Sequence, residues 1–317
     1  MSIDIANMEN FRELSCKLGE RDSRNPYSLT HWGLVGDSEI GSKSLAPKLW
    51  KQIFAETNLS VDYFVLGSNS KNDIVNFLER IKTNKENIGF NVARPWKGLV
   101  FSHCDYIETI AKKTKTVNTV LAINGKLYAT NTDGIGILKR INEVLSLTGK
   151  KVLIIGSGGA AQTVPHYLSL EGIEQLYLTD KEYLKSEHLR DLYLSDFLVK
   201  GISIDVIHKE EIIDTCKNID LIINATPCGM TGYPEYFPIS EEVIQSINPN
   251  ALVAEMVYTS EYTPLLIKCK NRRLKVLSGI YMLIEQAIFS FNIAFNVNLS
   301  EKEFKILFEE CKKGVLK

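Results

Sequence analysis

The sequence lacks the features that mark membrane, secreted and nucleic-acid-binding proteins. No apolar run approaches the roughly 20 residues needed to cross a bilayer. The N-terminal residues include Asp4, Glu9 and Glu13 and have no apolar core, so we expect neither a secretory signal nor a transit peptide. With 37 basic and 38 acidic residues the formal net charge is −1, which predicts no attraction to nucleic acid or to anionic membranes.

Paired cysteines and metal-ligand spacings are also missing. The five histidines show no ligand spacing, so we expect no metal site. No two cysteines form a CxxC pair, and we therefore expect reduced thiols in a cytoplasmic protein. The cysteines are Cys16, Cys104, Cys216, Cys228, Cys269 and Cys311.

A glycine-rich turn after an apolar run is the most informative stretch. Residues 151–155 read Lys-Val-Leu-Ile-Ile and are followed by Gly-Ser-Gly-Gly-Ala-Ala, the pattern of a buried parallel strand, a tight turn and a helix N-terminus. Gly156 would allow the turn, Gly158 would admit a pyrophosphate to the main chain, and Ala161 would permit close helix packing. A plain Gly-Gly loop is the alternative.

An acidic residue strengthens the dinucleotide interpretation. Residues 176–179 read Leu-Tyr-Leu-Thr and predict the next strand, which ends on Asp180 about two dozen residues after Gly156. A Rossmann unit places the carboxylate that binds the adenosine ribose at this point.

Strands and helices alternate along the rest of the chain. Strands are predicted at 30–35, 61–66, 89–92, 117–120, 126–130, 202–207, 219–224, 251–254 and 275–277, and helices at 45–57, 71–82, 135–147, 279–291 and from about 301. A loop is predicted over 36–44. The pattern predicts an α/β protein with two domains. We assign 1–28 to an extension, 29–132 with 279–317 to a substrate-binding domain, and 133–278 to a Rossmann domain that binds NAD(P).

Several motifs, in this order, resemble the shikimate dehydrogenase family with its quinate/shikimate relatives. They are Gly41-Ser42-Lys43-Ser44, the run 89–97 (Gly-Phe-Asn-Val-Ala-Arg-Pro-Trp-Lys), Val117-Asn118-Thr119, Asn131-Thr132-Asp133-Gly134, Gly156-Ser157-Gly158-Gly159-Ala160, the run 224–230 (Asn-Ala-Thr-Pro-Cys-Gly-Met), Val257-Tyr258, Thr263-Pro264-Leu265-Leu266 and the run 279–286. The resemblance implies an N-terminal α/β domain for a polyhydroxylated cyclohexene carboxylate, a Rossmann domain for NAD(P), and reaction in the cleft between them. It also implies that the C-terminal helices return to the first domain.

Oxidation of a secondary alcohol needs a hydride acceptor and a group that takes the hydroxyl proton. Lys97 and Asp133 suit this task, because burial lowers the pKa of a lysine and a facing carboxylate orients it. The resemblance assigns both the same catalytic roles. A solvated lysine and a helix-capping aspartate are the alternatives.

Binding residues follow from the same resemblance. The hydroxyls of Ser42 and Ser44 suit a substrate carboxylate, with helix capping as the alternative, and Tyr258 would add a third donor. Asn118 and Gln286 match amides that bind ring hydroxyls. The cofactor-binding candidates are Gly156, Ser157, Gly158, Gly159, Ala160, Asp180, Lys181, Asn224, Ala225, Thr226, Met230, Val257 and Gly279; residues 224–230 would flank the nicotinamide or form a plain loop.

The chain departs from the family pattern at several positions. Gly41 and Leu45 replace a histidine and a proline, Ser278 replaces an acid, and Ala93 replaces a threonine whose hydroxyl meets the substrate. The loss of that hydroxyl would cost roughly 1 kcal/mol and favours an amino- or deoxy-analogue as substrate.

The acidic end of the second Rossmann strand bears on cofactor choice. The family's NADP-using members carry Asn-Arg-Thr there, whereas this chain has Thr179-Asp180-Lys181. Because a carboxylate repels a 2′-phosphate, we predict a preference for NAD, with NADP as an alternative through Lys181 and Lys185.

These observations predict an NAD(P)-dependent oxidoreductase that interconverts a ring alcohol and ketone on shikimate or a shikimate-like acid, as in 3-dehydroshikimate reduction. Such an enzyme would serve aromatic amino acid biosynthesis through the chorismate pathway, and would act as a monomer or homodimer. A pathway-specific amino-shikimate or quinate dehydrogenase, and a non-catalytic cofactor- or metabolite-sensing relative, are the alternatives. Retention of both Lys97 and Asp133 argues against the sensor.

Overall fold

The computed structural model describes residues 27–230, 233, 237–258, 262–297 and 299–316. These residues divide into two compact units: those before Asp133 together with those after Glu285 form the first, and those from Asp133 to Glu285 form the second. The division falls inside helix α13 (Gly279–Phe295), so residues 279–285 belong to the second unit. The predicted extension over 1–28 lies almost entirely outside the described residues.

The first unit is built on a mixed six-stranded sheet of order β2-β1-β3-β5-β6-β4. Strands β1, β2 and β3 are parallel, and β5 turns antiparallel to β3 and to β6. The strands are β1 (His31–Gly36), β2 (Asp62–Gly67), β3 (Ile88–Val92), β4 (Tyr106–Ile107), β5 (Thr119–Ile123) and β6 (Lys126–Thr130). The Asn124-Gly125 hairpin predicted from the sequence joins β5 to β6.

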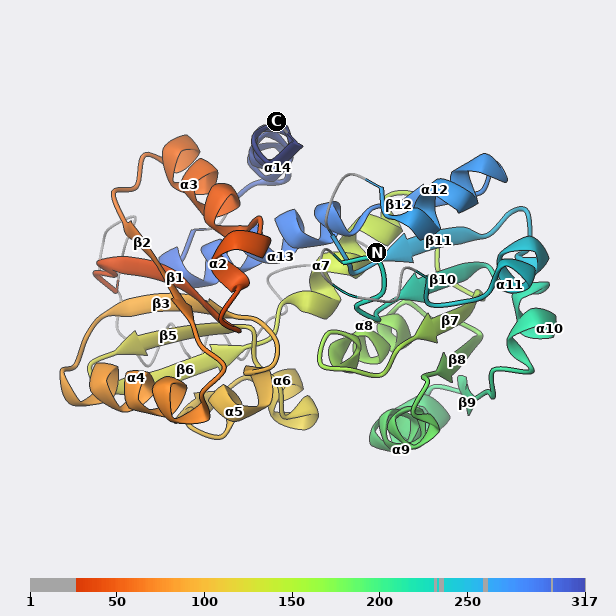
Figure 1. Cartoon of the computed structure of the whole chain (residues 1–317), viewed down its shortest axis with the longest axis horizontal. Coiled ribbons are helices and arrows are strands. Elements are labelled where there is room, and N and C mark those ends of the chain that lie inside the picture. The colour runs from red at the N-terminus through yellow and green to blue at the C-terminus, as the bar shows by residue number, and fades with distance from the viewer. Residues whose placement is uncertain (1–26, 231–232, 234–236, 259–261, 298, 317) are drawn as a thin grey trace. The chain divides into compact units, whose positions relative to one another are not determined.

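Helices cover both faces of this sheet (Figure 1). One face packs its apolar side chains against α4, α5 and α6 around Phe90. The other carries an aromatic cluster in which the ring centroid of Trp32 (β1) lies 4.2 Å from that of Trp50 (α3) and 6.2 Å from that of Phe295 (α13). The helices are α2 (Ile40–Lys43), α3 (Ala46–Thr57), α4 (Lys71–Thr83), α5 (Lys97–Phe101), α6 (Thr109–Thr114), the C-terminal part of α13, and α14 (Glu301–Leu316).

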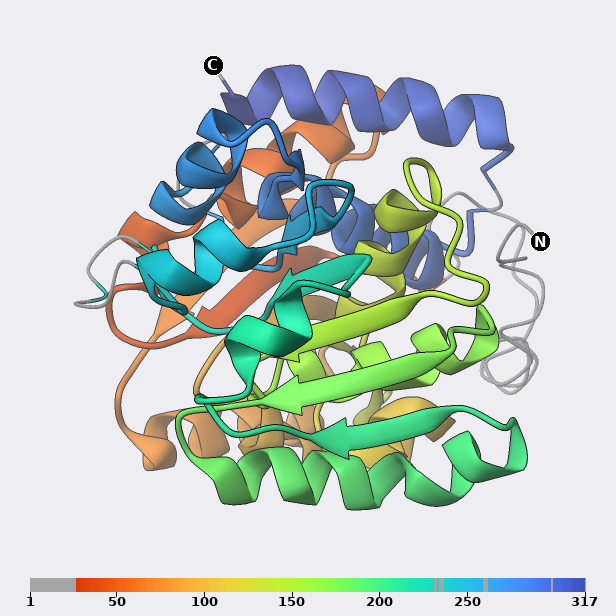
Figure 2. The ribbon, with the colours of Figure 1, turned by 90° about the vertical axis from the view of Figure 1, so that its right-hand side faces the viewer.

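The second unit is a Rossmann fold. Its sheet is wholly parallel in the order β12-β11-β10-β7-β8-β9, which is the doubly wound 3-2-1-4-5-6 order when β7 is counted first. Figure 2 shows β7, β8 and β9, in yellow-green to teal-green, running in one direction. The strands are β7 (Lys151–Ile155), β8 (Gln175–Thr179), β9 (Ser203–Val206), β10 (Leu221–Asn224), β11 (Leu252–Glu255) and β12 (Lys275–Leu277).

The helices of the second unit alternate with its strands. A hydrophobic core around Leu153 and Ile222 packs one face of the sheet against α10, α11 and α12. The helices are α7 (Asp133–Asn142), α8 (Val164–Leu170), α9 (Tyr183–Val199), α10 (Ile212–Cys216), α11 (Glu241–Ser246), α12 (Pro264–Asn271) and the start of α13. The prediction of a two-domain α/β protein is confirmed.

Three local predictions were wrong. The loop predicted over 36–44 contains the short helix α2, and the helix predicted to run to Leu147 ends at Asn142. The helix expected directly after the glycine-rich turn begins only at Val164, after a 3₁₀ turn over Ala161–Thr163. Pro165 explains the late start, because proline lacks a main-chain donor and favours the first turn of a helix.

Candidate active site

Three predicted site residues of the first unit, Ser42, Lys97 and Asn118, come from segments at the same end of its strands. Ser42 follows β1, and Lys97 follows β3. Asn118 directly precedes β5, which is antiparallel to β3, so that the start of β5 meets the end of β3. The main-chain N–H of Val117 donates to the carbonyl oxygen of Lys97 at 3.3 Å. The chain therefore brings the lysine and the asparagine to adjoining segments.

The segment that carries Lys97 is fastened to two neighbouring strands. The indole N–H of Trp96 donates to the carbonyls of Gly36, at 3.0 Å, and Ser68, at 2.9 Å, at the ends of β1 and β2. Ala93 N–H donates to the carbonyl of Val35 at 2.8 Å, and the Arg94–Pro95 peptide bond is cis. Lys97 is half-buried rather than buried as expected, because it begins a five-residue helix at the sheet edge instead of lying in the core.

The two amides predicted to bind ring hydroxyls contact each other. Asn118 is 3% exposed and Gln286 is 7% exposed. The side-chain amide of Asn118 donates to Gln286 Oε1 at 3.3 Å and to Thr132 Oγ1 at 3.0 Å. Residues far apart in the sequence thus form one buried polar group.

Ser290 extends this group and was not singled out from the sequence. Its hydroxyl lies 2.7 Å from Thr119 Oγ1 and 3.2 Å from Thr132 Oγ1, and it donates to the Gln286 carbonyl at 2.8 Å. Ser290 is one helical turn after Gln286 on α13, so both face the same side. A serine four residues after a polar residue in an apolar helix is the signal that could have found it.

Asn91 connects the same network to the core. Its amide donates to the Asn118 carbonyl at 3.1 Å, and its Oδ1 accepts from the indole N–H of Trp32 at 3.1 Å. We call the connected side chains the amide network. Its members are Asn91, Asn118, Thr119, Thr132, Gln286 and Ser290.

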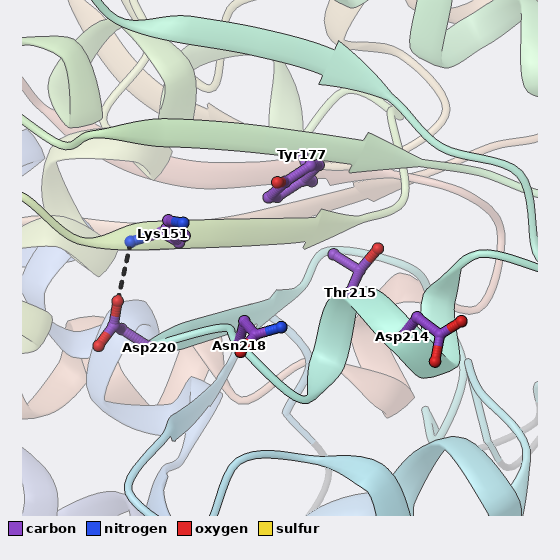
Figure 3. A pocket seen from close by; sticks show the side chains of 6 residues that line it. All are labelled: Lys151, Tyr177, Asp214, Thr215, Asn218 and Asp220. Atoms are coloured by element: carbon purple, nitrogen blue, oxygen red, sulfur yellow. Dashed lines mark hydrogen bonds between the residues drawn. The ribbon is translucent and has the colours of Figure 1, made fainter.

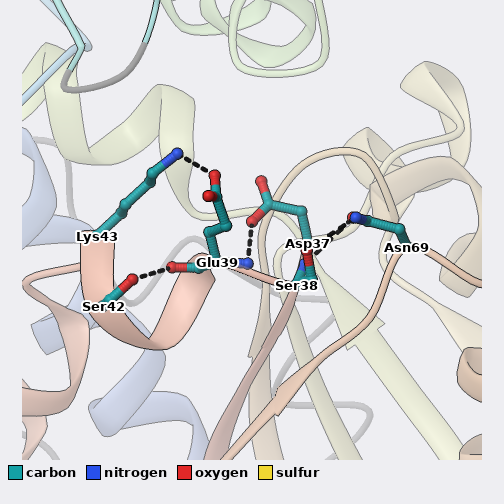
Figure 4. A network of polar contacts seen from close by, with 6 residues as sticks. All are labelled: Asp37, Ser38, Glu39, Ser42, Lys43 and Asn69. Atoms are coloured by element: carbon teal, nitrogen blue, oxygen red, sulfur yellow. Dashed lines mark hydrogen bonds and ion pairs between the residues drawn. The ribbon is translucent and has the colours of Figure 1, made fainter.

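The two serines predicted for the substrate carboxylate lie around the short helix α2. Ser42 Oγ donates to the Glu39 carbonyl at 2.9 Å. Ser44 Oγ accepts from the Ala46 N–H at 3.1 Å, so helix capping, the alternative interpretation, describes part of its role. Figure 4 shows Lys43 paired with Glu39 beside Ser42.

The turn before α2 is held from the neighbouring strand. Asp37 Oδ1 accepts from the Glu39 N–H at 3.0 Å, and Asn69 exchanges hydrogen bonds with Ser38 at 2.8 and 3.1 Å (Figure 4). Asn69 follows β2, so these hydrogen bonds join the loop that follows β1 to the loop that follows β2. The serine segment is therefore anchored although Ser42 itself is exposed.

Asp133 begins α7 in the second unit and is 6% exposed. The next residue, Gly134, donates its N–H to Thr163 Oγ1 at 3.0 Å. A Cβ at Gly134 would lie 2.6 Å from that oxygen, so only glycine allows the helix to approach so closely. Farther along α7, Arg140 forms an ion pair at 2.7 Å with the buried Glu285 of α13. The helix that carries Asp133 is thus fixed at its first turn and again near its end.

The two glycines singled out in the glycine-rich turn have different surroundings. Gly156 has a φ of +97°, and a Cβ there would lie 2.9 Å from the main-chain nitrogen of Thr226. At Gly158, by contrast, a Cβ would have nothing within 4 Å. The main chain of Gly158 is therefore accessible on the side where a Cβ would lie. The approach of a pyrophosphate to the main chain needs such access. Ala161 is wholly buried, consistent with close packing.

Asp180 closes the turn from the end of β8. Its Oδ2 accepts from the Ser157 N–H at 2.7 Å and its Oδ1 accepts from the Glu182 N–H at 2.9 Å. Lys181 is exposed, and Lys185 pairs with Glu182 at 2.6 Å. The carboxylate predicted to meet the ribose is therefore held in place by main-chain donors.

The remaining cofactor candidates surround the ends of β10 and β11. Asn224 is wholly buried, with its side chain bonded to Glu255 at 2.9 Å and to Thr226, so it shapes the loop from inside. Gly279 lies against Val257, where a Cβ would come within 2.0 Å of the carbonyl oxygen. The half-buried candidates here are Ala225, Thr226 and Met230, together with the substrate candidate Tyr258; Gly159 and Ala160 of the glycine-rich turn after β7 are half-buried as well.

A surface pocket of about 410 Å³ lies elsewhere in the second unit (Figure 3). It is lined by Lys151, Tyr177, Asp214, Thr215, Asn218 and Asp220. Lys151 begins β7 and Asp220 precedes β10, so these two lie at the opposite ends of the strands from Gly156 and Asn224. None of the predicted site residues lines it. Ligands of open α/β sheets bind at the carboxyl ends, and we exclude this pocket from the candidate site.

Two further findings concern only the described part of the chain. Within it, no cluster of three or more His, Cys, Asp or Glu side chains could hold a metal ion. No helix in the same residues is long and apolar enough to cross a membrane.

Comparison with known proteins finds relatives in both sequence and fold. A family model described as the shikimate dehydrogenase substrate binding domain matches residues 38–120. The shikimate dehydrogenase (NADP(+)) of Clostridium beijerinckii is 32% identical over 81% of this chain and 88% of its own. That of Desulforamulus reducens is 33% identical over 65% of this chain and 70% of its own.

A solved structure extends the agreement to three dimensions. The crystal structure of shikimate dehydrogenase from Aquifex aeolicus superposes with a TM-score of 0.76 at 26% identity, covering 91% of this chain and 98% of the other. The family model, the curated relatives and the solved fold converge on the same assignment. The chain therefore belongs to the shikimate dehydrogenase family of oxidoreductases.

Proposed function

We propose that this chain catalyses the NAD(P)-dependent interconversion of a ring alcohol and a ketone on shikimate or a shikimate-like acid, working as a 3-dehydroshikimate reductase. The observation that carries the proposal is the contact between Asn118 and Gln286, buried at the sheet edge to which Lys97 also belongs. Two hydrogen-bonding amides beside a half-buried lysine suit a polyhydroxylated ring. The Rossmann fold of the second unit supplies the dinucleotide site.

In the oxidative direction, Lys97 would accept the hydroxyl proton while the carbon–hydrogen bond breaks and the carbonyl forms. The nicotinamide, when bound, accepts the hydride. Asp133 would orient the ammonium and stabilise its charge. In the reductive direction Lys97 returns the proton to the carbonyl oxygen.

The substrate carboxylate would bind Ser42, Ser44 and Tyr258. Ser42 now donates to the Glu39 carbonyl, so binding would exchange that acceptor for a charged one and gain a stronger hydrogen bond. Ala93 offers only a methyl group where the family has a hydroxyl. This loss makes an amino- or deoxy-analogue, or quinate, the main competitor of shikimate as substrate.

We also propose that the cofactor is NAD in preference to NADP. The curated relatives are named as NADP(+) enzymes, whereas this chain holds the Asp180 carboxylate in place with two main-chain donors. Lys185, which could otherwise meet a 2′-phosphate, is paired with Glu182. A fixed anion repels that phosphate and accepts a ribose hydroxyl.

In this proposal one unit binds the substrate and the other binds the cofactor. Residues 29–132 with the C-terminal helices would bind substrate, and the Rossmann unit from Asp133 onward would bind the cofactor. The cofactor would contact the glycine-rich turn, Asp180 with Lys181, the 225–230 loop, and Val257 with Gly279.

A substrate panel with both cofactors tests the proposal. Reduction of 3-dehydroshikimate, 3-dehydroquinate and their amino analogues is followed by loss of NADH or NADPH absorbance. We expect turnover of 3-dehydroshikimate or one of its analogues and a higher kcat/KM with NADH. An NADPH preference of roughly tenfold, about 1.4 kcal/mol, would contradict the cofactor proposal alone. No oxidation of either cofactor with any substrate would contradict the enzymatic proposal.

A further inference from the structure

The second unit contains a buried carboxyl group that no step of the proposed reaction uses. Glu255 is the last residue of β11 and is wholly buried. It lies directly across from Asn224 of the neighbouring parallel strand β10. A buried charge or polar group is costly unless it is hydrogen-bonded, so the partners of this carboxyl define what it does.

Both partners of Glu255 are hydrogen-bond donors. The Thr263 hydroxyl donates to Oε2 at 2.6 Å, and the Asn224 amide donates to Oε1 at 2.9 Å. Thr263 is also the N-cap of α12 and accepts from the Leu266 N–H at 3.3 Å. Since the threonine already accepts there, its hydroxyl hydrogen is directed to the carboxyl.

The orientation of the Asn224 amide is fixed from its other side. Asn224 Oδ1 accepts from the Thr226 N–H at 3.0 Å and from the Thr226 hydroxyl at 2.7 Å. The amide nitrogen must therefore face Glu255. Thr226 Oγ1 in turn accepts from the Cys228 N–H at 3.2 Å. A single chain of hydrogen bonds runs from α12 through Glu255 into the loop after β10.

This loop packs against the glycine-rich turn. A Cβ added to Gly156 would lie 2.9 Å from the Thr226 main-chain nitrogen and 3.0 Å from the Ala225 carbonyl carbon. The Ala225 N–H also donates to the carbonyl of Ile155 at 2.8 Å. A displacement of Thr226 would therefore change the shape of the turn as well as that of the loop.

We propose that Glu255 is a positioning residue of the cofactor site, whose carboxyl holds the Ala225–Cys228 loop against the glycine-rich turn at Gly156. The inference rests on the proposed function, in which this loop and this turn bind the dinucleotide. An ionised carboxyl accepts at both oxygens and therefore fits between the two donors. Glutamine, of the same size, would turn an amide group toward one of them.

Two single variants, the corresponding double variant and a surface control test this role of Glu255. E255Q places a donor against a donor, and N224D places a carboxylate against a carboxylate. The double variant N224D/E255Q restores complementarity. Its new carboxylate at position 224 accepts from the new amide at position 255 and from Thr226, while the carbonyl oxygen of that amide accepts from Thr263. E241Q is the matched control, because Glu241 makes its ion pair with Lys268 at the surface.

NADH binding, followed by its fluorescence on titration, is the readout. We expect E255Q and N224D each to raise the Kd for NADH by about tenfold, the effect of one unsatisfied buried donor or acceptor. The double variant should return to within about threefold of wild type, and E241Q should not change. Among the variants that turn over, the KM for the ring substrate should change less than the NADH Kd.

The other possible outcomes also support or overturn the positioning role of Glu255. An E255Q protein that folds and binds NADH as wild type does would overturn the inference, as would a double variant whose loss equals the product of the two single losses. If E255Q does not fold, a folded double variant with near-normal NADH affinity supports the role and a double variant that binds no NADH overturns it. A wild-type protein that binds neither NADH nor NADPH would instead contradict the proposed function.

Discussion

The two units hold their candidate binding groups by different means. In the first unit, Asn118 and Gln286 are positioned by side chains of the amide network. In the second, the turn at Gly156 and the start of α13 at Gly279 are shaped by main-chain contacts too close for a Cβ. Two side chains, Asp180 and Glu255, add to these main-chain contacts. The candidate site of the first unit should therefore be sensitive to lost hydroxyls and amides, and that of the second to a Cβ added at Gly156 or Gly279.

The largest effect should come from the proposed proton-transfer residue of the first unit. Lys97→Ala should lower kcat by about 10²–10⁴-fold, the usual contribution of a positioned acid or base. Because Lys97 is half-buried in a short helix at the sheet edge, the fold and NADH affinity should be retained. Lys112→Ala, an exposed lysine of α6, serves as control. Near-normal turnover of the Lys97 variant would remove it from the mechanism.

Two glycines of the second unit should separate stability from cofactor binding. Gly279→Ala would place a Cβ 2.0 Å from the Val257 carbonyl oxygen and should cost about 3 kcal/mol of unfolding free energy. Gly158→Ala meets no atom within 4 Å, so it should keep that stability but weaken NADH binding. Urea unfolding and NADH titration of both variants check this. Equal stability losses would contradict the distinction.

The buried carboxyls of the second unit should give stability a pH dependence. Burial raises the pKa of Glu255 to about 7 against the hydrogen bonds from Thr263 and Asn224, and raises that of Glu285 to about 7 against the charge of Arg140. The folded state therefore keeps protons that the unfolded state releases. The stabilisation is complete below pH 4.5, the ordinary pKa of the group, and is lost as the pH rises through about 7.

Each carboxyl could contribute on the order of 3 kcal/mol to this change. Urea unfolding across that pH window measures the slope. Since glutamine does not titrate, E255Q should roughly halve the decline even if its stability is lower throughout. An unchanged slope in E255Q would show that Glu255 titrates alike in the folded and unfolded states.

The smallest effect should come from the hydroxyl of Ser290. Ser290→Ala removes contacts with Thr119 and Thr132 and should raise the KM for the ring substrate by about fivefold, near 1 kcal/mol. The NADH Kd should not change, because the amide network belongs to the first unit. Ser60→Ala, at an exposed loop position, is the control. A change in NADH affinity instead of substrate KM would contradict the division between the units.

Some of the site was predictable because its signals are local. The run 151–155 with Gly156 and Asp180 follows a spacing that any Rossmann unit must keep, and the structure places Asp180 against the glycine-rich turn. The hairpin at Asn124-Gly125 is likewise encoded by the turn itself. The contact of Asn118 with Gln286 was not local, and only the family resemblance pointed to both residues.

Other features depend on neighbours that the sequence does not display. Ser290 and Glu255 acquire their roles from residues on other elements, Thr119 and Asn224. The degree of burial of Lys97 depends on where its short helix lies at the sheet edge. The late start of α8 at Val164 reflects Pro165 more than the glycine pattern that drew attention to the turn.

The sequence by itself determined the two α/β units, the glycine-rich turn, the acid that closes it and the set of polar residues available for a ring substrate. The two units, the turn and the acid follow from periodicity, turn chemistry and motif spacing, which act over a few neighbouring residues. The polar residues for a ring substrate were indicated by the family resemblance. Only the tertiary structure decided that Ser290 completes the amide network and that Glu255 meets Asn224 at the end of β10. Hydrogen bonds between distant segments depend on strand order and register, and long-range packing sets both.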